Sequence, residues 1–268
     1  MTLPAQSPAR PAFTARKSLG QHFLRDTGLA RRIVAAAGDL AGTHVIEIGP
    51  GPGGLTAALL AAPAASLTAI EIDPRAVPAL EGLSTRHPER FRLIVADARH
   101  TQLASLVPPP RHVVANLPYN VATPLLITWL GQASAFAGLT LMFQAEVAER
   151  ITAQPGGSAY GRLSVLAQWT CRVATMLRLP PSAFLPRPKV SSAVVNFVPY
   201  PTQPPPALFA AMQRLTAAAF GQRRKMLRQA LKPLGGLALL ESAGIAPERR
   251  AETLSVAEFD RLARLLLT

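Results

Sequence analysis

The 268-residue sequence contains a single cysteine, Cys171, which lies in an apolar stretch. One thiol excludes a disulfide framework within the chain and a zinc site built from several cysteines, and it is consistent with a reducing compartment. The chain also has no uninterrupted apolar run of about 18 residues, the length that a membrane-spanning helix requires. We therefore expect a cytoplasmic protein without membrane attachment or a metal centre.

Acidic residues are missing from residues 151–240, which contain eleven lysines and arginines. Residues 1–25 hold four basic residues and no acid, whereas residues 26–150 are nearly balanced. The net charge is +13. A field of one sign on this scale favours a polyanionic partner such as nucleic acid. A general drift of composition towards arginine is the alternative explanation.

Proline marks the expected domain organisation. Residues 1–15 are rich in proline and alanine and have no apolar periodicity, so we expect a disordered N-terminal arm. Five prolines between Pro199 and Pro206 predict a boundary. We therefore divide the remaining chain into a large domain at 16–200 and a small helical domain at 201–268.

From residue 44 onward, apolar runs of strand length alternate with helical patterns. The predicted strands cover residues 44–48, 67–72, 91–96, 112–115, 138–143, 173–179 and 192–198, and a helix capped by Asp26 or Thr27 precedes them. This alternation predicts an α/β fold with a parallel sheet and helices on both faces. Such sheets bind ligands at the carboxyl ends of their strands.

Residues suited to ligand binding follow four successive predicted strands: Gly49, Glu71, Asp97 and Asn116. The glycine-rich loop at 49–54 lets the backbone approach a ligand, and the helix after it supplies free N–H groups. Glu71 can accept hydrogen bonds from ribose hydroxyls, and Asp97 can accept one from the amine of adenine. S-adenosylmethionine and a nicotinamide dinucleotide both fit this pattern, and the loop alone could be an ordinary strand-to-helix turn.

The segment Asn116-Leu117-Pro118-Tyr119-Asn120 ends a strand in a stiff turn, because Pro118 lacks an N–H group. We expect the next helix to start at Thr123-Pro124. If the Asn116 side-chain oxygen and the Leu117 carbonyl accept the two hydrogens of adenine's exocyclic amine, the nitrogen lone pair can point at a methyl donor. Positioning then supplies the rate, and no strong base is required. With Tyr119 stacked on the base, the segment predicts methylation of adenine.

Two further features could contact the substrate. Phe184 lies in a proline-bounded loop at 180–189, where it either packs within the loop or covers the second face of the target base. A predicted helix at 223–231 places Arg224, Arg228 and Lys232 at intervals of four on one face. With their neighbours they form a basic patch suited to phosphate contact, although a solvated helix face is the alternative. The patch comprises Arg223, Arg224, Lys225, Arg228 and Lys232.

Several motifs together resemble the KsgA-type small-subunit ribosomal RNA adenine dimethyltransferases, which have a Rossmann-like class I methyltransferase sheet and a small all-helical C-terminal domain. The resemblance covers about residues 16–265. It rests on KSLGQHFL at 17–24, EIGPG at 47–51, EID at 71–73, NLPYN at 116–120, YGRLSV at 160–165, PSAF at 181–184 and QRRK at 222–225. Pro52 and Ala57 depart from the family pattern, in which leucine and an acid are common.

The resemblance implies S-adenosylmethionine as the cofactor and a substrate in the small ribosomal subunit. It implies dimethylation of two adjacent adenosines in the 3′-terminal hairpin loop of 16S rRNA, within an assembly intermediate, by a monomeric enzyme of ribosome biogenesis. The implied catalytic residues are Asn116, Leu117, Tyr119 and Phe184. The implied cofactor contacts are His22, Leu24, Gly49, Gly51, Glu71, Ile72, Asp97, Ala98 and Asn116.

Two rival classes remain open. A large-subunit rRNA methylase that confers antibiotic resistance shares the asparagine motif, but the segments at 181–184 and 222–225 favour the small-subunit class. A non-catalytic assembly factor or mitochondrial transcription factor would keep the fold and lose turnover, yet Asn116 and Tyr119 are intact. A dehydrogenase would not need the asparagine turn.

Overall fold

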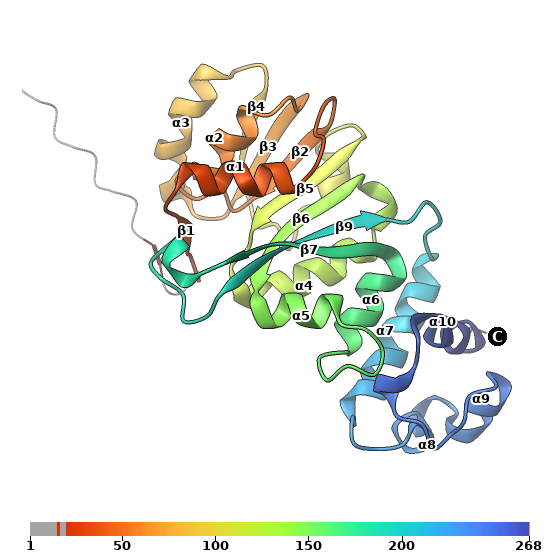
Figure 1. Ribbon diagram of the computed structural model, residues 1–268. Helices are drawn as coiled ribbons and strands as arrows, with labels where there is room; N and C mark the ends of the chain where they lie inside the picture. Colours follow the sequence, from red (N-terminus) through yellow and green to blue (C-terminus); the bar gives the residue numbers. More distant parts are fainter. Residues whose placement is uncertain (1–14, 17–19, 268) are drawn as a thin grey trace, which may run out of the picture.

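The computed structural model describes residues 15–16 and 20–267, so most of the predicted arm and the first three residues of the 17–24 motif lie outside the described residues. A seven-stranded sheet in the order β4-β3-β2-β5-β6-β9-β7 forms the centre (Figure 1). Its strands are β2 (His44–Ile48), β3 (Ser66–Glu71), β4 (Phe91–Val95), β5 (Arg111–Asn116), β6 (Gly138–Gln144), β7 (Cys171–Leu179) and β9 (Ser192–Pro199). All seven predicted strands are present, which confirms the α/β fold class.

The pairing of the strands decides where their ends lie. Strands β2 to β6 pair in parallel, β9 pairs antiparallel with β6, and the edge strand β7 pairs antiparallel with β9. Ile48, the last residue of β2, is level with Ile70 of β3 and with Ala115 of β5. The residues that follow these strands therefore gather at one edge of the sheet.

Helices cover both faces of the sheet (Figure 1). One face packs against α1 (Thr27–Ala36), α2 (Gly54–Leu60) and α3 (Val77–Arg86), and the other against α4 (Tyr119–Leu130), α5 (Ala145–Thr152) and α6 (Arg162–Thr170). Successive residues of a strand point to opposite faces. Val45 packs in the hydrophobic cluster under α1, α2 and α3, and Ile46 packs in the cluster under α4, α5 and α6. Both faces of β2, β3, β5 and β6 are thus buried, as expected for parallel strands, whereas the edge strand β7 is largely exposed.

Two helix starts illustrate the local chemistry. Asp26 caps α1 as predicted, with its Oδ1 accepting from the Gly28 N–H at 2.8 Å. Helix α4 begins at Tyr119, so the predicted start at Thr123-Pro124 is wrong, and Pro124 lies inside the helix. Pro118 supplies the break between strand and helix instead, so that the helix begins directly beyond β5.

A second, two-stranded sheet joins distant parts of the chain. Strand β1 (Phe23–Leu24) pairs antiparallel with β8 (Phe184–Leu185), and the Arg25 N–H donates to the Ala183 carbonyl at 3.0 Å. The N-terminal motif is thereby held against the proline-bounded loop (Figure 1). Short 3-10 helices complete the described chain: η2 (Pro74–Ala76), η3 (Leu103–Ser105), η4 (Ala133–Ala135), η5 (Pro181–Ala183), η6 (Lys232–Leu234) and η7 (Ala251–Thr253).

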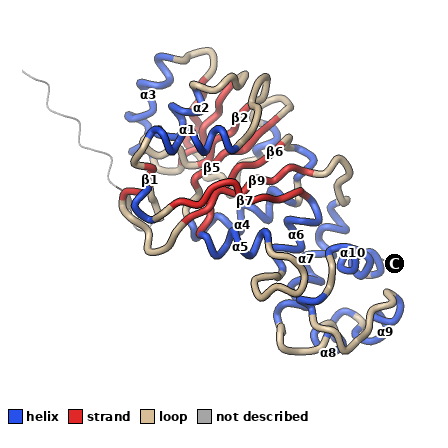
Figure 2. The backbone as a smooth tube through the Cα atoms, in the orientation of Figure 1, coloured by secondary structure: helices blue, strands red, loops and turns tan. Residues whose placement is uncertain are grey.

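Beyond β9 the chain contains helices and loops (Figure 2). The helices are α7 (Pro206–Gly221), α8 (Leu227–Ala230), α9 (Gly236–Ser242) and α10 (Val256–Leu265). Their apolar residues share one hydrophobic cluster with α4 and α6, so the core continues across the predicted boundary at 200/201. The division into two domains stays a prediction. No helix in the described ranges is long and apolar enough to cross a membrane.

The predicted helix at 223–231 is wrong in its first half. Gln222 ends α7 with φ −130° and ψ 55°, and Met226 is extended before α8 starts at Leu227. Arg224 therefore precedes the helix, Arg228 lies within it, and Lys232 lies in η6. These three side chains do not share one helix face, because the spacing rule applies only within an unbroken helix.

Candidate active site

A cavity of about 260 Å³ opens at the edge of the sheet where β2, β3, β4 and β5 end. It brings together ten of the predicted site residues: His22, Gly49, Gly51, Glu71, Ile72, Asp97, Ala98, Asn116, Leu117 and Tyr119. The remaining lining residues are Gly20, Gln21, Phe23, Ile48, Ile70, Ala96, Arg99, Pro118, Asn120, Val121 and Leu125. Four separate strand ends and the N-terminal motif thus contribute to one site.

The glycine-rich loop at 49–54 exposes its backbone to the cavity at Gly49 and Gly51. Gly49 has φ +68°, and a side chain built there would meet nothing within 4 Å. Gly51 has φ +52°, and a Cβ there would lie 2.7 Å from the Phe23 ring. Both positions need glycine, the first for its conformation and the second also for its close contact. Phe23 consequently packs directly over the loop.

Glu71 is held in place by two backbone donors. The Gly51 N–H donates to one carboxylate oxygen at 3.0 Å, and the Asp73 N–H donates to the other at 2.8 Å. Burial raises the pKa of Glu71, and these two hydrogen bonds oppose the rise. A carboxylate has about four lone-pair sites, so each oxygen can still accept a bond from a hydroxyl in the cavity.

Glu47 lies behind the loop rather than in the cavity. It alternates with Ile46 and Ile48, which places its side chain on the face that α1 and α2 cover. It is 1% exposed, and neither carboxylate oxygen has a hydrogen-bond partner within normal geometry among the described residues. Burial raises the pKa of Glu47 to about 8; the nearby Thr56 hydroxyl lowers it, and Glu71 raises it further. Among the described residues the Thr56 oxygen also lacks a hydrogen bond of normal geometry, so its effect on Glu47 is weak.

Asp97 carries a partner that the sequence did not suggest. The Arg99 guanidinium forms a bidentate ion pair with it, with Nη2 2.6 Å from Oδ2, and the Arg99 N–H donates to Oδ1 at 2.9 Å. The hydrogen bond from Arg99 is the main reason that the pKa of Asp97 is lowered. Asp97 is therefore a fixed, ionised acceptor at the cavity wall.

Asn116 has its amide orientation set by the N-terminal motif. Its Nδ2 donates to the His22 carbonyl at 2.8 Å. Because a carbonyl oxygen can only accept, the amide nitrogen must face His22. Within the described chain Oδ1 has no assigned hydrogen bond and remains available as an acceptor at the cavity.

The rings of His22 and Tyr119 lie side by side at the cavity. Their centroids are 5.6 Å apart with an interplanar angle of 29°. His22 Nδ1 lies 2.8 Å from the Pro186 carbonyl, which requires a hydrogen on Nδ1 and leaves Nε2 as the acceptor of a neutral ring. The Tyr119 hydroxyl lies 2.7 Å from the Ser192 hydroxyl. Burial raises the pKa of the Tyr119 phenol, and the Ser192 bond opposes the rise.

Two predicted site residues do not reach the cavity. Phe184 is fully buried in the cluster beneath α1 and α2, and Leu24 packs against the same cluster. They are paired residues of β8 and β1, and this pairing turns both side chains into the core. In this structure Phe184 therefore cannot cover a base in the cavity, which corrects the prediction of a stacking platform. Phe23, beside Leu24, lines the cavity instead.

The five residues of the basic patch are all exposed, at the opposite end of the molecule from β1 (Figure 1). Two of them have partners. Arg223 donates to the Ser158 carbonyl at 2.9 Å, and Arg228 lies 3.8 Å from a Glu248 carboxylate oxygen. A guanidinium has five donors, so both arginines keep donors for a further ligand.

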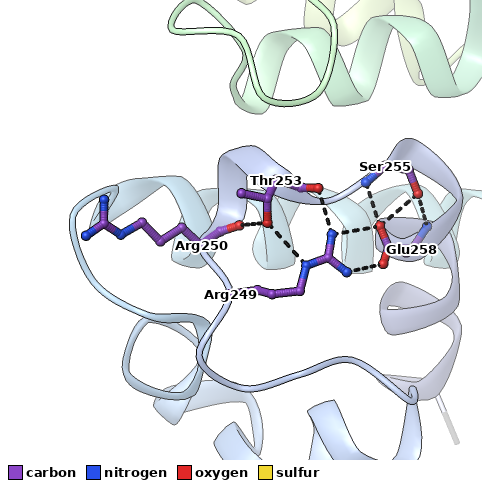
Figure 3. A network of polar contacts seen from close by, with 5 residues as sticks. All are labelled: Arg249, Arg250, Thr253, Ser255 and Glu258. Carbon is purple, nitrogen blue, oxygen red and sulfur yellow. Dashed lines mark hydrogen bonds and ion pairs between the residues drawn. The ribbon is translucent and has the colours of Figure 1, made fainter.

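The segment before η7 supports this patch. The Arg249 and Pro247 carbonyls accept from the Leu227 and Arg228 N–H groups at 2.8 and 3.1 Å, which satisfies the first turn of α8. Arg249 in turn pairs with Glu258 and donates to the Thr253 carbonyl (Figure 3). A capping box between Ser255 and Glu258 completes this network at the start of α10.

Neither Arg99, which lines the cavity, nor Ser192, which bonds to Tyr119 from outside it, was predicted from the sequence. Arg99 could have been suspected because it follows Asp97 by two residues. Ser192 is 73 residues from its partner Tyr119, and no local periodicity relates the two. Gln21, within the N-terminal motif, lines the cavity and donates to Asp73 at 3.3 Å.

Comparison with known proteins identifies close relatives. The chain is 60% identical to the ribosomal RNA small subunit methyltransferase A of Gluconobacter oxydans (strain 621H), covering 94% of this chain and 84% of that protein. It is 52% identical to the protein of the same name from Paramagnetospirillum magneticum, covering 96% and 92%.

Solved structures show the same fold. A dimethyladenosine transferase from Plasmodium falciparum has a TM-score of 0.77 at 27% identity, covering 90% of this chain and 96% of that one. The 23S rRNA methyltransferase ErmE has a TM-score of 0.68 at 24% identity, covering 92% and 100%, and this likeness extends to the fold alone.

The family model described as ribosomal RNA adenine dimethylase matches residues 12–267. That match spans both the cavity and the C-terminal helices, as do the alignments with the two bacterial relatives. This chain belongs to the ribosomal RNA adenine dimethylase family.

Proposed function

We propose that this protein transfers methyl groups from S-adenosylmethionine to the exocyclic amines of two adjacent adenosines in the 3′-terminal loop of small-subunit rRNA. The observation that carries the proposal is the Asn116 amide, whose nitrogen is fixed on the His22 carbonyl while its oxygen stays available at the cavity. The names of the bacterial relatives support the small subunit as the substrate.

The residues around the cavity fit the cofactor. A carboxylate held by backbone donors suits a ribose, a fixed ionised Asp97 suits the amine of an adenine, and the open Gly49 position lets a ligand approach the backbone. Ile72 and Ala98 would supply apolar contacts on either side of the adenine, and His22 Nε2 would accept from the amino group of the methionine part. When bound, S-adenosylmethionine supplies an electrophilic methyl group on sulfur.

The chain's own residues can activate the amine without a strong base. The lone pair of adenine's exocyclic nitrogen is delocalised into the ring, which makes it a poor nucleophile. Asn116 Oδ1 and the Leu117 carbonyl would accept its two hydrogens and favour a pyramidal nitrogen whose lone pair is directed along the transfer axis. Transfer of the methyl group would leave the sulfur as a neutral thioether and would place positive charge on the nitrogen, which Asn116 Oδ1 and the Leu117 carbonyl would stabilise. The proton then leaves to solvent.

The target base needs a surface to bind after it leaves its stack. His22 stacks against the Tyr119 ring, and Tyr119 lines the cavity, so we propose that the target base stacks on the ring face turned away from His22. An unpaired loop adenosine costs less to extrude than a paired one. The exposed basic patch would bind phosphates of the same particle at a distance from the cavity. We further propose that the protein acts as a monomer in the cytoplasm, on an assembly intermediate of the small subunit.

The decisive variant is Asn116→Ala. Loss of one positioned acceptor should lower single-turnover methyl transfer by about 10²- to 10³-fold, while RNA binding stays nearly unchanged. Asn196→Ala is the matched control, because the Asn196 amide also donates to a backbone carbonyl, that of Ala36, but away from the cavity. Unchanged transfer in Asn116→Ala would refute the mechanism.

The substrate is tested by transfer from labelled cofactor, comparing unmethylated small subunits, unmethylated large-subunit rRNA and naked small-subunit rRNA. Mass spectrometry then locates the product. We expect dimethyladenosine on the small subunit. Label on large-subunit RNA alone would move the protein to the resistance class, and tight binding of the particle without transfer would make it an assembly factor.

A further inference from the structure

Ser192 is the first residue of β9, and its side chain is fully buried. Its backbone lies opposite Gln144, the last residue of β6, so Ser192 stands at the same edge of the sheet as the cavity. Its hydroxyl lies 2.7 Å from that of Tyr119, the usual length of a good O–H···O hydrogen bond. Two chain segments 73 residues apart are joined there, one at the start of β9 and one at the start of α4.

This bond restrains the ring at the end far from the backbone. The Cα of Tyr119 is fixed by the first turn of α4, and one ring face lies beside His22. A phenol side chain turns about two torsions, and a bond at its tip removes most of the remaining freedom. The Tyr119 ring is thereby held at one tilt relative to Asn116, which lines the same cavity.

A purely stabilising role explains the pair less well. An intramolecular hydrogen bond contributes little net stability, because both hydroxyls lose their bonds to water on burial. Phenylalanine in place of Tyr119 and alanine in place of Ser192 could fill the same space. What a hydroxyl pair provides and an apolar pair lacks is direction. Ser192 touches neither cavity nor solvent, and it can act on a ligand only through Tyr119.

We infer that Ser192 is a positioning residue for methyl transfer: through the Tyr119 hydroxyl it fixes the tilt of the ring on which the target adenine stacks. The inference rests on the proposed function, since it requires a base to bind at Tyr119. A small error in the position of the base misaligns the amine with the methyl donor. Loss of the Ser192–Tyr119 bond should therefore lower the rate of methyl transfer more than the affinity for RNA, because many phosphate contacts contribute to that affinity.

The test uses the full-length protein with unmethylated small subunits, in four forms: wild type, Ser192→Ala, Tyr119→Phe and the double variant. Each single change removes the same hydrogen bond. We expect each to lower the single-turnover rate by about tenfold, with the double variant no slower than the slower single variant. Cofactor affinity measured by calorimetry and particle affinity should change less than about threefold.

Thr216→Val is the control for loss of a buried hydroxyl. Thr216 is fully buried in α7, where it donates to the Met212 carbonyl at 2.8 Å, and α7 contributes no residue to the cavity. This variant should lose stability but keep the rate. If Ser192→Ala fails to fold, Tyr119→Phe still tests the inference, because it removes the same Ser192–Tyr119 hydrogen bond by a change at the partly exposed partner.

Several outcomes would overturn the inference. They are a wild-type rate in either single variant, a double variant whose losses multiply, and an equal loss of rate in Thr216→Val. An inactive wild type that also fails to bind cofactor would instead refute the proposed function. The two failures are therefore distinguishable.

Discussion

Glu47 gives a prediction about stability that can be worked out in numbers. Replacing it with glutamine keeps the size of the side chain and removes its ability to ionise. Glu47 is buried between the sheet and α2 without a well-formed hydrogen bond among the described residues, and its pKa is raised from 4.5 to about 8. At neutral pH the folded protein therefore carries this side chain protonated.

The direction of the pH effect follows from the raised pKa. Below pH 4.5 both folded and unfolded chains are protonated at Glu47, and this group contributes no pH dependence. Between 4.5 and about 8 only the unfolded chain gives up the proton, so the free energy of unfolding falls as pH rises. A rise of this size corresponds to roughly 4–5 kcal/mol. Relaxation of the protein and penetration of water reduce the cost of ionising a buried carboxyl group, so we expect a measured stability difference of ~2–4 kcal/mol.

The assay is urea unfolding of wild type and Glu47→Gln at intervals from pH 4.5 to 9. The free energy of unfolding of the variant should equal that of the wild type near pH 4.5. As the pH rises the variant should become steadily more stable than the wild type, by ~2–4 kcal/mol near pH 8.5. Glu81→Gln, on the exposed side of α3, is the control and should show no such gain. A constant difference between Glu47→Gln and wild type across this range would refute a buried, protonated Glu47.

Three further predictions concern other parts of the molecule. Arg224→Glu combined with Arg228→Glu should weaken RNA binding and flatten its dependence on salt in filter-binding titrations; an unchanged slope would leave the basic patch as a solvated surface. Glu258→Gln should lower the free energy of unfolding by ~1–2 kcal/mol at pH 7 after allowance for solvent screening. Since Arg249 lowers the pKa of Glu258 to about 2, the stabilisation is complete above 4.5 and is lost as pH falls through about 2, where the two unfolding curves should converge. Gly51→Ala should reduce cofactor affinity in calorimetry by about tenfold or more, because φ +52° and the Phe23 contact both oppose a Cβ; unchanged affinity would show that the loop can shift.

The strands and their terminal residues could be predicted from the sequence because both depend on local patterns. Apolar runs of four to six residues predicted β2 to β6, and parallel pairing then required Gly49, Glu71, Asp97 and Asn116 to meet at one edge. The structure confirms that meeting. The roles of these residues toward cofactor and base stay predictions.

The predictions that failed depended on where a local pattern stops or on contacts between distant segments. The spacing of Arg224, Arg228 and Lys232 fitted a helix, but the chain between α7 and α8 is not helical. Its extended course is supported by the carbonyls of Pro247 and Arg249, which satisfy the start of α8. Basic residues spaced four apart in the sequence carry no information about carbonyl groups of a distant segment that hold the chain extended.

The sequence by itself determined the parallel part of the sheet, the order of the chemical groups at its strand ends and the resemblance to rRNA adenine dimethyltransferases, whereas the antiparallel pairing of β9 was not predicted. Only the tertiary structure decided which of those groups face the cavity. Pairing of β1 with β8 turned Phe184 into the core, and the start of β9 brought Ser192 to Tyr119. The physical reason is that strand alternation and helix spacing act over a few residues, whereas burial and hydrogen bonding depend on segments that folding brings together.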